Sequence, residues 1–344
     1  MTPRVLFIAD AGPQVGGGHV MRSLTLAAAL TERGARCEFM ADAHVEAILS
    51  AYAPDIPRRA IASMAPDVLA AQTGDQAFEA VVFDHYGLER AAHEGIADGR
   101  PALVIDDLAN RPLGGAVVLD SGPARTEADY RGLTISGARL LLGPNYAPVR
   151  PAFAALRSSA LARRQGTPRR VLVSMGLTDL DGITGRVVEQ LRRRYGEIAL
   201  DVVVGASAPS RKGLTRIAAH DPRLTLHVDT PEMAELATAA DLAVGAAGSA
   251  MWERCVLGLP SVVVTIADNQ VPAATALSKA GAVLMVDARA ESFGVDFDRA
   301  MTRLIIDEPL RASLTARSAE LCDGAGAARV AETFWPLLVQ AATV

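Results

Sequence analysis

The chain has 344 residues, half of them apolar, which is enough for two domains with separate hydrophobic cores. Its 34 basic and 39 acidic residues give a net charge of −5, a balance that argues against a general nucleic-acid-binding protein. The three cysteines, Cys37, Cys255 and Cys322, are far apart in the sequence, so neither a disulfide framework nor a zinc site is indicated.

Signals for membrane insertion or export are not found in the sequence. No apolar run is long enough to span a bilayer, and the first residues lead directly into a predicted strand without a signal-peptide pattern. We therefore expect a cytoplasmic protein with no membrane span and no nucleic-acid partner. The sequence does not fix the oligomeric state, for which a monomer is the expectation.

Short β-rich runs alternate with helical runs over the first half of the chain, which predicts a parallel sheet with helices on both faces. The proline-punctuated segment Ala53–Thr73 fits neither pattern. The predicted strands are Arg4–Ala9, Cys37–Met40, Ala80–Phe83, Ala102–Ile105, Ala116–Leu119 and Leu140–Leu142. The predicted helices are Val20–Arg33, Ala43–Ala51, Leu88–Ala97 and Pro151–Arg164.

A domain boundary is predicted near the middle of the chain. Pro144, Pro148 and Pro151 crowd one stretch, and the polar run from Arg163 to Pro168 follows it. We accordingly predict an N-terminal domain over residues 1–160 and a C-terminal domain, ending in additional helices, over residues 168–344.

The same alternation restarts after this boundary. Two doubly wound α/β domains would face a cleft, with ligands at the carboxyl ends of the strands. The predicted strands are Arg170–Ser174, Ala199–Val204, Leu224–His227, Leu242–Val244, Ser261–Val264 and Val283–Val286. The predicted helices are Thr184–Tyr195, Ser210–His220, Pro231–Ala239, Ser249–Leu257, Gln270–Ala280, Asp298–Asp307, Glu308–Leu321 and Ala325–Leu338.

The turn Gly16-Gly17-Gly18-His19 joins the first predicted strand to the first predicted helix. Its glycines let the backbone approach a ligand, and the helix N–H groups carry partial positive charge, so the turn is a candidate anion site. It has neither the spacing of the dinucleotide fingerprint nor the lysine of the P-loop. The helix N-terminus disfavours a cationic His19, which we therefore predict to be a neutral general base. The alternative is that His19 caps the helix or donates a hydrogen bond to a phosphate.

The other five histidines have weaker cases. His85 is near the predicted cleft, but its neighbours Asp84 and Tyr86 are better placed to meet a ligand. The remaining four are expected to be packing or surface residues; they are His44, His93, His220 and His227.

A second turn of small residues, Gly245 to Ser249, also follows a strand and opens a helix. Such a turn lets a pyrophosphate lie against the helix N-terminus. Glu253 shares a helix face with Ser249 and is one position beyond a capping-box glutamate, so we predict that it accepts hydrogen bonds from ribose hydroxyls. In the alternative, Ser249 only caps the helix and Glu253 lies in solvent.

Further polar turns follow four other predicted strands. Ser174-Met175-Gly176 could supply N–H groups to the phosphates or be a simple loop, and Asp268-Asn269-Gln270 could contact the ligand or cap a helix. Asp84-His85-Tyr86 and Asp106-Asp107 place acids where a sugar's hydroxyls or amides would meet them. Carboxylates from these two loops could also act as a glycosidase pair if their separation suited it.

Taken together, these motifs resemble one family across nearly the whole chain, the UDP-2,4-diacetamido-2,4,6-trideoxy-β-L-altropyranose hydrolases of pseudaminic acid biosynthesis. Spore-coat polysaccharide proteins are related, and more remotely the peptidoglycan glycosyltransferase that adds N-acetylglucosamine to a lipid. The residues that carry the resemblance are Gly16 to Arg22, Asp84-His85-Tyr86, Ile105 to Ala109, Leu142 to Pro151, Gly248 to Cys255 and Asp268-Asn269-Gln270.

The resemblance implies a GT-B fold of two Rossmann-like domains, in which the C-terminal domain binds UDP and the N-terminal glycine loop meets the sugar. It implies that His19 is the general base, that Glu253 holds the ribose and that Asn269 and Gln270 approach the sugar diphosphate, with no metal or cofactor. It also places the product in flagellin glycosylation. The candidate substrate-binding residues are Gly17, Gly18, Arg22, Asp84, Tyr86, Asp107, Tyr146, Ser174, Gly176, Gly248, Ser249, Glu253, Asn269 and Gln270.

Two departures from the family pattern are visible. Asp120-Ser121 stands where the family often has Asn-Gln, which bears on the identity of the sugar, and Met175-Gly176 replaces a glycine pair.

The predicted reaction is inverting hydrolysis with C–O cleavage, because UDP leaves readily and one base suffices to activate water. One alternative is a GT-B glycosyltransferase using a UDP-sugar donor, with the basic stretch from Arg157 to Arg170 as a candidate acceptor surface. The other is a non-catalytic UDP-sugar-binding protein.

Overall fold

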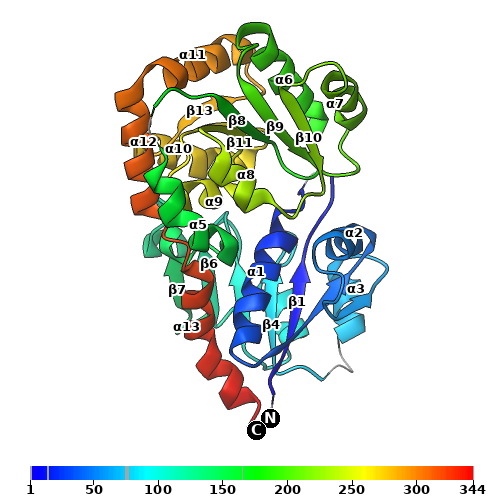
Figure 1. Ribbon diagram of the computed structural model, residues 1–344. Helices are drawn as coiled ribbons and strands as arrows, with labels where there is room; N and C mark the ends of the chain where they lie inside the picture. Colours follow the sequence, from blue (N-terminus) through cyan, green and yellow to red (C-terminus); the bar gives the residue numbers. More distant parts are fainter. Residues whose placement is uncertain (1, 14, 74–76, 165, 344) are drawn as a thin grey trace. The chain divides into compact units, whose positions relative to one another are not determined.

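The computed structural model describes residues 2–13, 15–73, 77–164 and 166–343. Its chain divides into two compact units (Figure 1). Unit 1 comprises Met1–Pro148 together with Ala325–Val344, and unit 2 comprises Val149–Gly324. Each unit is built around its own parallel sheet.

Within the described residues, unit 1 contains a seven-stranded parallel sheet with the strand order β3-β2-β1-β4-β5-β6-β7. Its inner strands are short apolar runs buried on both faces, as parallel sheets between helices require. The strands are β1 (Arg4–Ala9), β2 (Arg36–Ala41), β3 (Arg58–Ala60), β4 (Ala80–Asp84), β5 (Ala102–Ile105), β6 (Val117–Asp120) and β7 (Arg139–Leu142). The helices are α1 (Gly18–Glu32), α2 (Ala43–Tyr52), α3 (Pro66–Thr73), α4 (Arg90–Ala97) and α13 (Gly326–Ala341), with 3-10 turns η1 (Glu127–Tyr130) and η2 (Pro144–Tyr146).

Unit 2 contains a six-stranded parallel sheet over its described residues, in the order β10-β9-β8-β11-β12-β13. The strands are β8 (Arg170–Ser174), β9 (Ala199–Val204), β10 (Leu224–Val228), β11 (Leu242–Ala246), β12 (Ser261–Thr265) and β13 (Leu284–Asp287). The helices are α5 (Pro151–Ala162), α6 (Ile183–Arg194), α7 (Arg211–Ala218), α8 (Met233–Ala239), α9 (Ala250–Val256), α10 (Val271–Lys279), α11 (Phe293–Ile306) and α12 (Glu308–Leu321), with 3-10 turns η3 (Leu180–Gly182) and η4 (Asp268–Gln270).

The two sheets have their switch points at equivalent strands. In unit 1, β1 lies between β2 and β4, and in unit 2, β8 lies between β9 and β11. The strand order reverses direction there, so the loops after these strands diverge and leave room at the carboxyl ends, where ligands of doubly wound sheets bind. The glycine turn follows β1 and the small-residue turn follows β11, so both predicted motifs lie at a switch point.

The predicted elements agree with the structure in type and differ in two places. The unassigned segment contains β3 and α3, which the sequence pattern misses because β3 is a three-residue edge strand with two arginines. Helix α11 begins at Phe293, five residues before the predicted start, because Phe293 and Phe297 bury the first turn despite Gly294.

The division of the chain also differs from the predicted boundaries. Helix α5 belongs to unit 2, whereas the C-terminal α13 belongs to unit 1, where it lies beside α1 (Figure 1). The reason is packing, because Val330, Phe334 and Leu338 of α13 are fully buried in the core of unit 1. Gln165, inside the predicted linker, lies outside the described residues.

The structure also bears on two expectations from the sequence, which concern the state of the cysteines and the presence of a membrane-spanning helix. All three cysteines are buried and free, and burial raises the pKa of the Cys37 and Cys255 thiols to about 11 and about 12. In the part of the chain that the structure describes, no helix combines the length and the apolar character that crossing a membrane requires.

Candidate functional site

Helix α1 starts at Gly18, directly after the glycine turn, and places His19 in its first turn. Gly17 is the N-cap residue, and because it has no side chain, no side-chain hydrogen bond caps the helix. Gly16 has a φ of 81°, a left-handed conformation that favours glycine. His19 itself is buried and does not cap the helix. The helix-capping alternative for this residue is therefore wrong.

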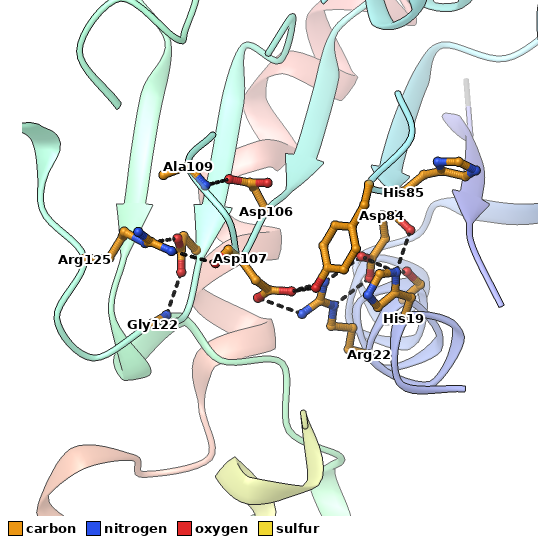
Figure 2. Close-up of polar contacts among 12 residues, drawn as sticks. His19, Arg22, Asp84, His85, Asp106, Asp107, Ala109, Gly122 and Arg125 are labelled. Carbon is orange, nitrogen blue, oxygen red and sulfur yellow. Dashed lines mark hydrogen bonds and ion pairs between the residues drawn. The ribbon is translucent and has the colours of Figure 1, made fainter. Parts of the chain in front are cut away.

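The imidazole of His19 is held by the residue that ends β4. Its Nδ1 lies 3.1 Å from the main-chain carbonyl oxygen of Asp84 and 3.3 Å from the Asp84 carboxylate (Figure 2). Both of these oxygens are acceptors, so Nδ1 carries a proton and donates to them. In the neutral ring, the tautomer selected by this contact has its lone pair on Nε2, as a general base requires.

A buried ion-pair cluster lies beside His19. Arg22, one turn later on α1, donates from Nε and Nη2 to the two carboxylate oxygens of Asp84, both at 2.6 Å, and from Nη1 to Asp107 at 2.9 Å (Figure 2). Tyr86 donates its hydroxyl to Asp107 at 2.6 Å, and its ring meets the His19 ring edge-on at 4.5 Å. Four of the predicted site residues and His19 therefore form one connected network.

The electrostatics of this cluster fix its charges. Burial alone would raise the pKa of Asp107, but the charge and hydrogen bonds of Arg22 and the hydroxyl of Tyr86 lower it to about 2. Burial and the neighbouring Asp107 carboxylate raise the pKa of Tyr86 far above its usual range, so its hydroxyl remains a donor. At neutral pH the cluster contains a cation, two acceptors and a phenol.

The members of the cluster differ in access to a ligand. Asp84 is fully buried, and Arg22 and Ser23 surround its carboxylate. Its predicted role as a substrate-binding residue is therefore better described as positioning His19 and Arg22. The Asp107 side chain is 25% exposed and lies at the accessible side of the network.

A second acid cluster lies behind the first one in unit 1. The hydroxyl of Tyr130 contacts Asp106 at 2.9 Å and Asp120 at 2.7 Å, and both acids are fully buried. Arg111 pairs with Asp106. Arg125 pairs with Asp120 and donates to the main-chain carbonyl of Asp107 (Figure 2). Asp106 is thus structural, and Asp120, the departure from the family pattern, braces the loop that carries Asp107.

His85 is closer to this chemistry than its sequence context indicated. It is buried, its Nδ1 accepts from the main-chain N–H of Gly87 at 3.0 Å, and its Nε2 lies 3.9 Å from Asp10 at the end of β1. Burial lowers the pKa of His85 and outweighs the opposing effect of the Asp10 carboxylate, so the ring is neutral at pH 7. The other four histidines lie as predicted, with His93 in the core and His44 and His220 exposed, while His227 pairs with Asp201.

In unit 2, the turns after β8 and β11 present backbone rather than side chains. Gly176 is exposed with a φ of 102°, and Gly248 is exposed with open space around it. The side chain of Ser249 makes no cap hydrogen bond at the start of α9. The alternative in which this hydroxyl only caps the helix is therefore wrong. Ser174 is half-buried at the end of β8 and is the register partner of Gly245 on β11.

Glu253 is neither free nor in solvent. Its carboxylate accepts two hydrogen bonds from Arg150, at 2.6 and 3.0 Å, and its side chain is 12% exposed. The alternative in which Glu253 lies in solvent is therefore wrong, and a bidentate arginine orients the carboxylate. Arg150 was visible in the sequence only as the next-to-last residue of the Leu142–Pro151 motif.

The turn Asp268-Asn269-Gln270 forms η4 at the carboxyl end of β12. The side chain of Gln270 accepts from the main-chain N–H of Ile266 at 3.1 Å, Asp268 pairs with Arg289, and Asn269 is exposed. Neither Asp268 nor Asn269 caps a helix. Tyr146 lies in η2, half-buried against the core of unit 1, and among the described residues it makes no hydrogen bond with the His19 network.

The basic stretch of the predicted boundary is used inside unit 2. Arg157 donates to main-chain carbonyls of Val256, Ala319 and Cys322, and Arg164 donates to those of Ala237, Ala240 and Leu257. These carbonyls lie at or near helix C-termini, which attract positive charge. Arg157 and Arg164 therefore tie helices together and are not available as a basic surface.

Comparisons with known proteins agree with the resemblance seen in the motifs, although no family model matches the chain. The UDP-2,4-diacetamido-2,4,6-trideoxy-β-L-altropyranose hydrolase of Campylobacter jejuni is 24% identical over 280 residues, which cover 81% of this chain and 97% of that protein. The spore coat polysaccharide biosynthesis protein SpsG of Bacillus subtilis is 26% identical over 194 residues. That match covers 56% of this chain and 57% of SpsG, so it spans less than two thirds of SpsG.

Solved structures establish the fold. MurG of Acinetobacter baumannii matches 98% of this chain and 100% of its own with a TM-score of 0.67 and 16% identity. CalG4, the calicheamicin glycosyltransferase, matches 98% of both chains with a TM-score of 0.65 and 15% identity. The predicted GT-B fold and the predicted resemblance to the hydrolase are both confirmed, and together the comparisons support an enzyme.

Proposed function

We propose that this protein is a nucleotide-sugar hydrolase that releases UDP from UDP-2,4-diacetamido-2,4,6-trideoxy-β-L-altropyranose. Support comes from the Campylobacter relative, which is named as that hydrolase and of which the match covers 97%. The single structural observation that carries the proposal is the Nδ1–carbonyl contact of His19, which leaves Nε2 as a neutral base. The free sugar would enter pseudaminic acid synthesis and, beyond it, the glycosylation of flagellin in the cytoplasm.

The chemistry requires one base and a stabilised leaving group. His19 Nε2 takes a proton from water, the water oxygen bonds to the anomeric carbon, and the anomeric C–O bond breaks with its electron pair leaving on UDP. Attack opposite the leaving group inverts the anomeric configuration. Asp84 and Arg22 position the imidazole, and backbone N–H groups of the turns at Gly176 and Gly248 stabilise the diphosphate.

The substrate roles of the remaining residues follow from their access. Asp107 and Tyr86 meet the amide or hydroxyl groups of the sugar, with Gly17 and Gly18 letting it approach the backbone. Glu253, oriented by Arg150, accepts from the ribose, and Asn269 and Gln270 approach the sugar diphosphate. None of these steps needs a metal, and the described residues include no cluster of three or more His, Cys, Asp or Glu side chains arranged to bind one.

A glycosyltransferase on the same fold is the alternative, and it needs an acceptor other than water. The stretch that was the candidate acceptor surface gives it little support, because Arg157 and Arg164 are bound to main-chain carbonyls. A non-catalytic UDP-sugar-binding protein is the second alternative.

The test is UDP release from the UDP-diacetamido sugar without acceptor and with EDTA, for wild type and His19→Gln. We expect wild-type turnover and a loss of at least about 100-fold in the variant, the usual scale for a general base. Tight UDP binding with no release unless an acceptor is added would support the glycosyltransferase. Unchanged release in His19→Gln would remove the base assignment.

A further inference from the structure

A buried arginine lies at the switch point of the unit 2 sheet. Arg254 is on α9, and its Nη2 donates to the main-chain carbonyl of Ala246 at 2.8 Å. Its guanidinium lies against Gly245, where an added Cβ would come within 2.7 Å of the guanidinium carbon and overlap Nη1. Gly245 is therefore a glycine because Arg254 occupies the space of its side chain, between the strands β8 and β11 and the turns that follow them.

Among the described residues of unit 2, no carboxylate forms an ion pair with Arg254. The side chain is 3% exposed, and both Nε and Nη1 lack a hydrogen-bond partner among the described residues. The adjacent Glu253 is bound to Arg150. Cys255 is not a thiolate, because burial raises its pKa to about 12.

Arg254 nevertheless remains charged at neutral pH. Burial lowers the pKa of its guanidinium, but only to about 10. A buried and unpaired cation destabilises a folded protein, so a sequence keeps one only where something compensates for it. The carboxyl ends of β8 and β11 are where a doubly wound sheet binds its ligand, and the ligand proposed above is an anion.

We propose that Arg254 is a buried positioning residue for the nucleotide diphosphate, acting through its positive charge and through its hydrogen bond to the Ala246 carbonyl. The proposal rests on the UDP-binding role proposed for unit 2 and goes beyond it by assigning the counter-charge. The bound diphosphate supplies the negative charge that the free protein lacks at this point. Arg254 in turn holds the turn 246–249 in the conformation that presents its N–H groups.

The central test compares UDP with uridine, which has the same base and ribose but no phosphates. In Arg254→Met, a neutral side chain of similar length, we expect UDP affinity to fall by about tenfold or more while uridine affinity changes less than about twofold. Arg254→Lys keeps the charge and should retain most of the UDP affinity. Both ligands are measured by isothermal titration calorimetry in EDTA.

Thermal stability of the unliganded protein provides the second readout. Removing an uncompensated buried charge should leave the melting temperature of Arg254→Met unchanged or higher. Arg164→Met is the matched control, because burial also lowers the pKa of Arg164 to about 10, yet its guanidinium is bound to three carbonyls. Arg164→Met should melt several degrees lower, and its ratio of UDP to uridine affinity should equal that of wild type.

The outcomes separate this inference from the proposed function. If wild type binds no UDP, the nucleotide role of unit 2 and this inference both fail. If wild type binds UDP and Arg254→Met binds it equally well, or loses UDP and uridine affinity in parallel, only the inference fails. A clear drop in the melting temperature of Arg254→Met would also contradict it, since the charge would then serve the packing of unit 2.

Discussion

The Nδ1 atom of His19 lies 3.1 Å from the main-chain carbonyl oxygen of Asp84, so the residue that ends β4 selects the tautomer and orientation of a ring on α1. A main-chain acceptor cannot be removed by substitution, which makes this orientation resistant to change. The Asp84 side chain adds the pairing with Arg22, and the two contacts together fix α1 against the end of the sheet.

Asp84→Asn should be strongly destabilising. The change leaves the buried Arg22 with Asp107 as its remaining carboxylate, and breaking a buried pair from one side costs about 3 kcal/mol. The free energy of unfolding of unit 1 can be followed by the fluorescence of Trp335 on α13, in a Trp252→Phe background that removes the other tryptophan. Ser23→Ala is the control, since its hydroxyl contacts Asp84 at 3.4 Å and its loss should cost little. Equal effects of the two changes would contradict the ion-pair account.

Asp107→Asn should change how unit 1 responds to acid. Its pKa is about 2 in the folded protein against 3.8 ordinarily, so it contributes about 2 kcal/mol above pH 4 that is lost as pH falls towards 2. Wild type should therefore be more stable than the variant at pH 7, and this difference should shrink between pH 4 and pH 2. Chemical denaturation at several pH values measures it, with the exposed Asp98→Asn as control. A stability difference between the two proteins that stays constant down to pH 2 would show that the pKa of Asp107 is not lowered in the folded protein.

His93 is a source of acid lability in the core of unit 1. Its buried ring accepts from the main-chain N–H of Gly114 at 3.2 Å, and burial lowers its pKa to about 3. The unfolded chain binds a proton near pH 6.5, so stability should fall by about 1.4 kcal/mol per pH unit from pH 6.5 towards pH 3. His93→Gln keeps an acceptor for Gly114 and should lose this slope between pH 6 and pH 4. The exposed His220→Gln should keep it, and a slope unchanged in both variants would count against the assignment.

Glu253 can be tested with a nucleotide that lacks one ribose hydroxyl. If the carboxylate held by Arg150 accepts from the ribose, wild type should prefer UDP over 2′-deoxy-UDP by about tenfold. Glu253→Gln should reduce this preference to near unity, because the loss of the acceptor affects only the hydroxylated ligand. Titration calorimetry of wild type and Glu253→Gln with UDP and with 2′-deoxy-UDP gives the coupling free energy between the carboxylate and the ribose hydroxyl. A preference that survives in Glu253→Gln would leave the Glu253–Arg150 pair with a structural role alone.

Much of the fold was predictable because parallel sheets have a strong sequence signature. Runs such as Val5 to Ala9 and Ala80 to Phe83 are buried on both faces and are apolar throughout, and each is followed by a turn or helix. The motif turns were found for the same reason, since they follow these strands. The short edge strand β3 and the placement of α13 in unit 1 depend on tertiary packing, which local pattern does not encode.

The site was predictable in its residue types and less so in its partnerships. His19, Arg22, Asp84, Tyr86 and Asp107 come from three separate segments, each of which follows a predicted strand. The sequence did not show that Arg22 would bind both acids. The pairing of Glu253 with Arg150 was not predicted, because the two residues are 103 positions apart in sequence. The sequence contained one indication that Arg254 is buried, because this charged residue directly precedes the apolar Cys255, Val256 and Leu257.

The most direct test of the account is a single-turnover reaction of wild type and His19→Gln with the UDP-diacetamido sugar in H₂¹⁸O, without acceptor and with EDTA. The account predicts that wild type releases unlabelled UDP, since water attacks carbon. It also predicts that His19→Gln is at least about 100-fold slower with unchanged UDP affinity. Label in the UDP, or equal rates for the two proteins, would contradict it.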